Sequence, residues 1–101
     1  MGEYYVCIKD MPESMRPREK LMLKGEATLN EAELLAIILG GGTKKINAVD
    51  LAMRLLSKHN NLRQLKDASL EELMMEKGIG PVKAVSIKAA LELGRRAAID
   101  A

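Results

Sequence analysis

The chain has 101 residues, enough for one small domain, and it contains two tyrosines but no Phe and no Trp. Its apolar residues are mostly Leu, Ala, Ile, Val and Met, which favour helices over strands, so the composition predicts an all-α protein. The net charge of +2 identifies no partner, and the single cysteine excludes an internal disulfide and a cysteine-based zinc cluster.

No segment has the pattern of a signal peptide, because Lys9, Asp10 and Glu13 interrupt the apolar residues near the N-terminus. No run approaches the roughly 20 apolar residues that a membrane span needs. We therefore expect a cytoplasmic protein that does not interact with membranes.

The first predicted elements are an arm and two helices. Residues 1–16 show no helical period and predict a short extended N-terminal arm, followed by one helical domain over residues 17–101. Pro17 and Gly25 are placed to begin and end a first helix. Asn30 and Glu33 have the spacing of a capping box, which predicts the start of a second helix that ends at Gly40.

Three further helices follow. One begins after Asn47, and residues 60–68 form a connector that holds one helical turn. Ser69 and Glu72 form another capping box at the start of a short helix, and the longest helix follows Pro81. We thus predict a compact bundle of about five short helices, with a core formed by Leu34, Leu35, Ile38, Leu51, Leu55, Leu73, Ile79, Val85 and Leu91.

The segment "KGIGPVKA", Lys77 to Ala84, separates the last two helices. Gly78 and Gly80 can adopt backbone angles that a Cβ forbids, and Ile79 between them is expected to be buried as the hairpin core residue. The turn leaves a helix N-terminus open, with unpaired N–H groups and a positive dipole end that favour a phosphate. Lys83 and Lys77 add full positive charges on either side. A plain interhelical turn is the alternative.

An earlier segment repeats this arrangement in a weaker form. Ala48 and Val49 precede Ala84 and Val85 by 36 positions, and "GGGT", Gly40 to Thr43, takes the place of the glycine turn. Gly41 replaces the buried isoleucine, so this hairpin is degenerate. A second phosphate contact is predicted here, and solvated loop lysines are the alternative. The candidate residues are Gly40, Gly42, Thr43, Lys44 and Lys45.

"GIGPVKAVSIKAALELGRR" resembles the helix-hairpin-helix motif of DNA-repair and recombination proteins. The order of "IKDMPESMRPREKLMLKG", "LNEAELLAIILGGGT", "AVDLAMRLL" and "LEELMMEKGIGPVKA" resembles the N-terminal domain of the RadC DNA-repair protein family. This resemblance implies tandem helix-hairpin-helix elements. By similarity, Gly78, Gly80, Val82 and Lys83 contact DNA phosphates, and the carbonyls from Lys77 to Gly80 hold a monovalent cation when DNA is bound.

Members of that family usually continue into a C-terminal metal-binding domain with a histidine pair and an aspartate as ligands. This chain stops at Ala101, so we expect it to be an excised domain. Its one histidine, His59, is expected to complement the end of a helix rather than to bind a metal. We predict no metal site and no other cofactor in these residues.

The sequence is compatible with three classes of function to different degrees. The first is a non-catalytic module that binds DNA through its phosphates without reading bases, since no aromatic residue lies at a turn. The second is an enzyme, which we do not expect: Asp100 follows Gly80 by 20 residues, as in some glycosylases, but it has no surrounding catalytic group. No small-molecule substrate is expected either. The third is a protein-interaction module, whose binding would be less sensitive to salt.

Overall fold

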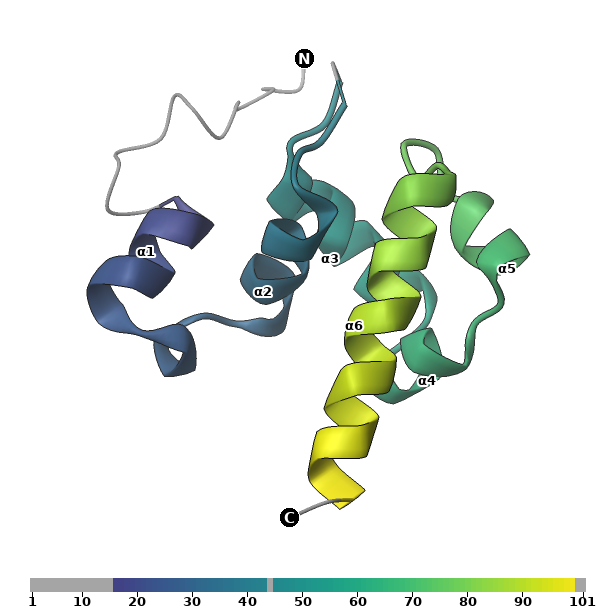
Figure 1. Ribbon diagram of the computed structural model, residues 1–101. Coiled ribbons are helices and arrows are strands. Elements are labelled where there is room, and N and C mark those ends of the chain that lie inside the picture. The colour runs from purple at the N-terminus through teal and green to yellow at the C-terminus, as the bar shows by residue number, and fades with distance from the viewer. Residues whose placement is uncertain (1–15, 44, 100–101) are drawn as a thin grey trace.

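The computed structural model describes residues 16–43 and 45–99, and Figure 1 shows their arrangement. In chain order the elements are α1 (Pro17–Lys24), the 3₁₀ turn η3 (Glu26–Thr28), α2 (Glu31–Leu39), α3 (Ala48–Lys58), α4 (Leu62–Asp67), α5 (Leu70–Met74) and α6 (Pro81–Ile99). The described residues contain no strand, and the all-α prediction is confirmed. The predicted extended arm falls almost entirely on residues 1–15, which lie outside the described residues.

The helix ends follow the local sequence signals. Both hydrogen bonds of the predicted capping box are present at α2: the Glu33 amide donates to the Asn30 side chain over 2.8 Å, and the Asn30 amide donates to the Glu33 carboxylate over 2.9 Å. Ser69 and Glu72 form the same pair of bonds at α5. Gly25 ends α1 with a φ of 92°, a conformation that favours glycine.

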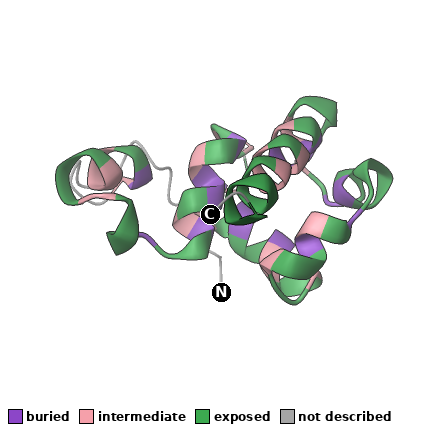
Figure 2. Cartoon of the chain, turned by 60° about the horizontal axis from the view of Figure 1, so that its bottom comes forward, coloured by how far each residue is buried: buried purple, intermediate pink, exposed green. Residues whose placement is uncertain are grey.

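The core lies where α2, α3 and α6 meet, with α4 and α5 packed against α6 (Figure 1). Figure 2 shows that the buried positions occupy the surfaces on which these helices face one another. The largest fully buried side chains are Leu51, Leu55, Leu65, Leu73 and Ile87. Helix α1 lies to one side and contacts α2 and η3. An ion pair of 3.1 Å between Lys20 and Glu33 joins it to α2.

Most of the predicted core is correct. Leu35, Leu51, Leu55, Leu73 and Ile79 are buried, and Leu91 is half-buried against the core. The prediction is wrong for three residues.

In α2, the side chains of Leu34 and Ile38 are exposed, because the helix packs with Ala32, Leu35 and Leu39, which recur at the spacing of one helical face. Val85 is 54% exposed, because α6 turns Ala84 and Ile87 inward instead.

The predicted number of helices needs one change. Residues 60–68 were expected to hold a single turn, and the chain forms the six-residue helix α4 there, with the Asn61 side chain accepting from the Gln64 amide at its start. Helix α6 has 19 residues and is the longest element, as predicted. None of the helices in residues 16–43 and 45–99 combines the length and the apolar character that crossing a membrane requires.

Candidate nucleic-acid interface

The segment between α5 and α6 forms a tight turn, which we call the second hairpin (residues 75–80). The Ile79 amide donates to the Glu76 carbonyl over 3.0 Å, and the Ile79 side chain is only 4% exposed, so it holds the turn against the core as predicted. Gly78 has a φ of 101°, which a residue with a Cβ rarely adopts. Helix α6 then begins with Pro81, and its first backbone bond runs from the Ala84 amide to the Gly80 carbonyl over 3.0 Å.

The two glycines of this hairpin have different roles, which corrects one expectation. Only Gly78 has a positive φ, so the backbone-angle argument does not apply to Gly80. A Cβ placed on Gly80 would meet no atom within 4 Å. The open space beside Gly80 is where an anion could approach the backbone closely.

The start of α6 presents hydrogen-bond donors at this opening. The amides of Val82 and Lys83 precede the first backbone bond of the helix, and within the described residues neither donates to a carbonyl. The helix dipole places partial positive charge at the same end. Lys83 is half-buried in the first turn of α6, and Lys77 is exposed in the hairpin. Together these groups form a site that favours an anion.

The segment between α2 and α3, which we call the first hairpin (residues 40–47), is held by its own hydrogen bonds. The Thr43 amide donates to the Ile46 carbonyl over 2.8 Å, and the Thr43 hydroxyl accepts from the Lys45 and Ile46 amides over 3.1 and 3.2 Å. A Cβ on Gly42 would collide with the Ile46 carbonyl oxygen, so this position requires close backbone approach. Thr43 and Gly42 therefore shape the loop.

The remaining candidate residues of the first hairpin are Gly40, Lys44 and Lys45, and the structure describes two of them. Gly40 is the C-cap of α2, with a φ of 81°, and Lys45 is exposed. Lys44 lies outside the described residues. The predicted phosphate contact by these lysines stays a prediction.

The two hairpins touch each other. A Cβ on Gly78 would lie 2.8 Å from Cγ2 of Thr43 and 3.5 Å from a methyl group of Leu51. Gly78 therefore needs to be glycine for two reasons, its backbone angle and the methyl group of the neighbouring hairpin. Because the loops are in contact, the first hairpin supports the turn that positions Lys77 and Lys83.

The C-terminal basic residues, which looked alike in sequence, fall into two groups. Lys88 donates from Nζ to the carbonyls of Lys66 and Ala68 over 2.8 and 2.7 Å, so it joins α6 to the end of α4. Arg95 and Arg96 both form ion pairs with Glu92. Their hydrogen bonds, of which the one from Arg95 has the larger effect, lower the pKa of Glu92 to about 2. This leaves Lys77 and Lys83 at the hairpin.

The second hairpin itself contains a buried carboxylate. Glu76 is almost fully buried, and its Oε2 lies 3.7 Å from a guanidinium nitrogen of Arg54 on α3. An unbalanced negative charge here would oppose the binding of an anion at the hairpin. Arg54 offsets that charge and connects α3 to the turn.

His59 is the C-cap residue of α3, at the helix end where it was predicted. Its Nε2 is buried and has no hydrogen-bond partner within the described part of the chain. Over the same residues, no group of three His, Cys, Asp or Glu side chains comes together as metal ligands. Asp100 lies outside the described residues.

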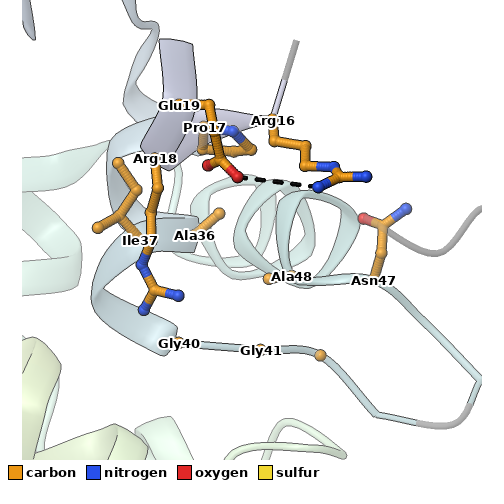
Figure 3. A pocket seen from close by; sticks show the side chains of 11 residues that line it. Arg16, Pro17, Arg18, Glu19, Ala36, Ile37, Gly40, Gly41, Asn47 and Ala48 are labelled. Atoms are coloured by element: carbon orange, nitrogen blue, oxygen red, sulfur yellow. Dashed lines mark ion pairs between the residues drawn. The ribbon is translucent and has the colours of Figure 1, made fainter. Parts of the chain in front are cut away.

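Sequence reasoning missed a cavity of about 230 Å³ between α1 and the first hairpin (Figure 3). Its lining includes two arginines of the α1 start and the three consecutive glycines of the loop: Arg16, Pro17, Arg18, Glu19, Ala36, Ile37, Gly40, Gly41, Gly42, Asn47 and Ala48. The "RPR" sequence at the start of α1 was the available signal, since it places two arginines beside a helix-initiating proline.

Comparison with known proteins gives the family. Residues 8–85 match the family model described as UPF0758 N-terminal. The chain belongs to the UPF0758 family. It is similar to UPF0758 proteins of Syntrophomonas wolfei, at 63% identity over 99 residues, and of Desulforamulus reducens, at 51% identity over 94 residues. This membership confirms the resemblance to the N-terminal region of the RadC family.

The matches cover 95% and 93% of this chain but only 42% and 41% of those two UPF0758 proteins. The chain thus spans about two fifths of the length of the curated relatives that it matches. No solved structure matches the chain.

Proposed function

We propose that this domain binds DNA without sequence preference, through the phosphate groups of its backbone. The observation that carries the proposal is the opening beside Gly80, where the amides of Val82 and Lys83 have no partner among the described residues. Lys77 and Lys83 make no ion pair there, whereas Lys88, Arg95 and Arg96 are engaged elsewhere. Backbone donors at a helix N-terminus with adjacent lysines are suited to phosphate and carry no sequence information.

On this proposal the domain is a cytoplasmic binding module, without catalytic activity, small-molecule substrate or resident cofactor. A monovalent cation at the carbonyls of residues 77–80 is the one ion that belongs to the proposal, and it would be bound together with DNA. In a protein of its relatives' length, the domain would deliver a C-terminal metal-binding domain to DNA.

The test is a titration of fluorescent duplex, single-stranded and junction DNA at several salt concentrations. Each phosphate contact contributes about −0.9 to the slope of log K against log salt for a duplex, so Lys83→Ala should reduce the slope by about one. Lys58→Ala is the matched control, because Lys58 ends α3 about 15 Å along the helix from the first hairpin. The proposal is wrong if the wild-type domain fails to bind at low salt, or if Lys83→Ala binds as wild type does.

A second candidate function is docking of a protein partner. Val82, Val85 and Leu93 are exposed and recur along one side of α6 at helical spacing, and such a stripe suits an apolar partner. Binding through this stripe would change little with salt. Val85→Ser would weaken it and leave the DNA salt slope unchanged.

A further inference from the structure

The cavity between α1 and the first hairpin, which we call the α1 cavity, has an apolar floor and a polar rim. The floor is formed by Pro17, Ala36, Ile37 and Ala48, and the rim by Arg16, Arg18, Glu19 and the glycines of the loop. Figure 3 shows the Arg18 side chain descending beside Ile37 toward Gly40. The volume of about 230 Å³ is about eight times the ~30 Å³ that a water molecule occupies in the liquid. It therefore accommodates a phosphate group together with its sugar.

The charges on the rim favour an anion. Arg16 and Glu19 lie 3.9 Å apart and offset each other. Arg18 is exposed, and it makes no ion pair within residues 16–43 and 45–99. The rim therefore carries one guanidinium in excess, with a planar arrangement of donors that fits phosphate oxygens.

The glycine loop adds backbone donors to the same rim. A Cβ on Gly40 or Gly41 would meet no atom within 4 Å, so the loop backbone can be approached closely from that side. The amides of Gly41 and Gly42 donate no hydrogen bond within the described residues. Gly41 and Gly42 lie about 20 positions from Arg18 in the sequence, and all three residues line the same cavity.

The cavity and the proposed DNA site are linked through the first hairpin, which lines the cavity and contacts the second hairpin. Gly42 on the cavity rim is followed by Thr43, and the Thr43 methyl group abuts Gly78 of the second hairpin. We propose that the α1 cavity binds a further phosphate of the same nucleic acid, held by Arg18 and the Gly41 and Gly42 amides, with the deoxyribose against the apolar floor. This inference rests on the proposed function, and it extends the binding surface from the two hairpins to α1.

The test compares Arg18→Ala with Arg63→Ala in the duplex titration. Arg63 is an exposed arginine on α4, which lies away from both hairpins (Figure 1). Losing one phosphate contact reduces the salt slope by about 0.9, which corresponds to about eightfold weaker binding at 0.1 M salt. Arg18→Ala should show this loss and Arg63→Ala should not. Arg18 is exposed, so the variant is expected to fold, and circular dichroism checks that it does.

A second measurement locates the contact. In nitrogen-edited NMR spectra, duplex DNA should shift the Gly41 and Gly42 amides of wild type, and Arg18→Ala should remove these shifts while those of Val82 and Lys83 remain. Inorganic phosphate is added alone as a comparison. The inference is overturned if only the second hairpin responds to DNA, or if inorganic phosphate shifts the loop amides and DNA does not. In the first case Lys83→Ala still weakens binding and the proposed function survives. If wild type binds no DNA, both fail.

Discussion

Replacing Gly78 by Ala should destabilise the domain severely, whereas the same change at Gly80 should not. Gly78 has a φ of 101°, and a left-handed backbone costs an L-residue about 1–2 kcal/mol. The new Cβ would also lie 2.8 Å from Cγ2 of Thr43. Thr43 cannot rotate away freely, because its hydroxyl accepts hydrogen bonds from the Lys45 and Ile46 amides. Overpacking of this kind adds about 1–3 kcal/mol.

The two costs together give a loss of about 3 kcal/mol in the free energy of unfolding. For a domain of this size, 1 kcal/mol lowers Tm by about 4–8 °C, so Gly78→Ala should melt about 12–24 °C below wild type. At Gly80 the φ is not positive and a Cβ meets no atom within 4 Å. Gly80→Ala should therefore be as stable as wild type or more stable by about 0.4–1 kcal/mol, because only the conformational entropy of the unfolded chain falls.

Urea unfolding followed by far-UV circular dichroism measures both variants, and midpoints are compared at a common m-value. The reasoning is refuted if Gly78→Ala unfolds within 0.5 kcal/mol of wild type, or if Gly80→Ala loses as much stability as Gly78→Ala. The same two variants also distinguish an effect on folding from an effect on DNA binding. If the domain binds DNA as proposed, Gly80→Ala should be folded and yet bind DNA more weakly, because its methyl group would occupy the open space beside residue 80.

Three further changes test how the domain is held together. Lys88→Met should lower the free energy of unfolding by about 2–4 kcal/mol in urea titrations, because the carbonyls of Lys66 and Ala68 lose two charge-assisted bonds; a change below 1 kcal/mol would contradict this role. Leu55→Ala removes a fully buried side chain and should cost about 2–5 kcal/mol by the same assay, against almost nothing for the exposed Met53→Ala. The pKa of Glu33 lies below 4.5, mainly because its carboxylate accepts a hydrogen bond from the Asn30 amide, and to a smaller extent because of Lys20. The stability that Glu33 contributes is therefore present above pH 4.5 and is lost as the pH falls through its lower folded-state pKa. Thermal melts of Glu33→Gln should accordingly depend less on pH below 4.5 than those of wild type, and parallel curves would rule out this linkage.

Local signals predicted the helix ends well, and less local features were predicted poorly. The capping boxes at Asn30 and Ser69 depend on residues three positions apart, so the sequence contains everything that decides them. In contrast, α2 is apolar on nearly every side, and its sequence does not indicate which face meets the core. Leu34 and Ile38 were assigned to the core for that reason.

The role of a charged residue was the hardest feature to predict. Lys83 and Lys88 lie on one helix and look equivalent in sequence. Lys88 is held by carbonyls about 20 positions earlier in the chain, and only the packing of α4 against α6 brings these together. The α1 cavity could not be predicted for the same reason. Arg18 lines one side of it and the first hairpin lines the other, and only the fold brings these two segments together.

The degenerate first hairpin has a structural role that does not depend on its matching the motif. The first hairpin departs from the motif because Gly41 stands where the second hairpin has Ile79. The structure shows that Thr43 packs its methyl group on Gly78, while Gly42 lets the loop backbone pass close enough to bring Thr43 there. Even if the first hairpin contacts no phosphate, its packing against Gly78 is needed to maintain the conformation of the second hairpin. Weak DNA binding by a first-hairpin variant therefore demonstrates a phosphate contact only if the Gly78 turn remains intact.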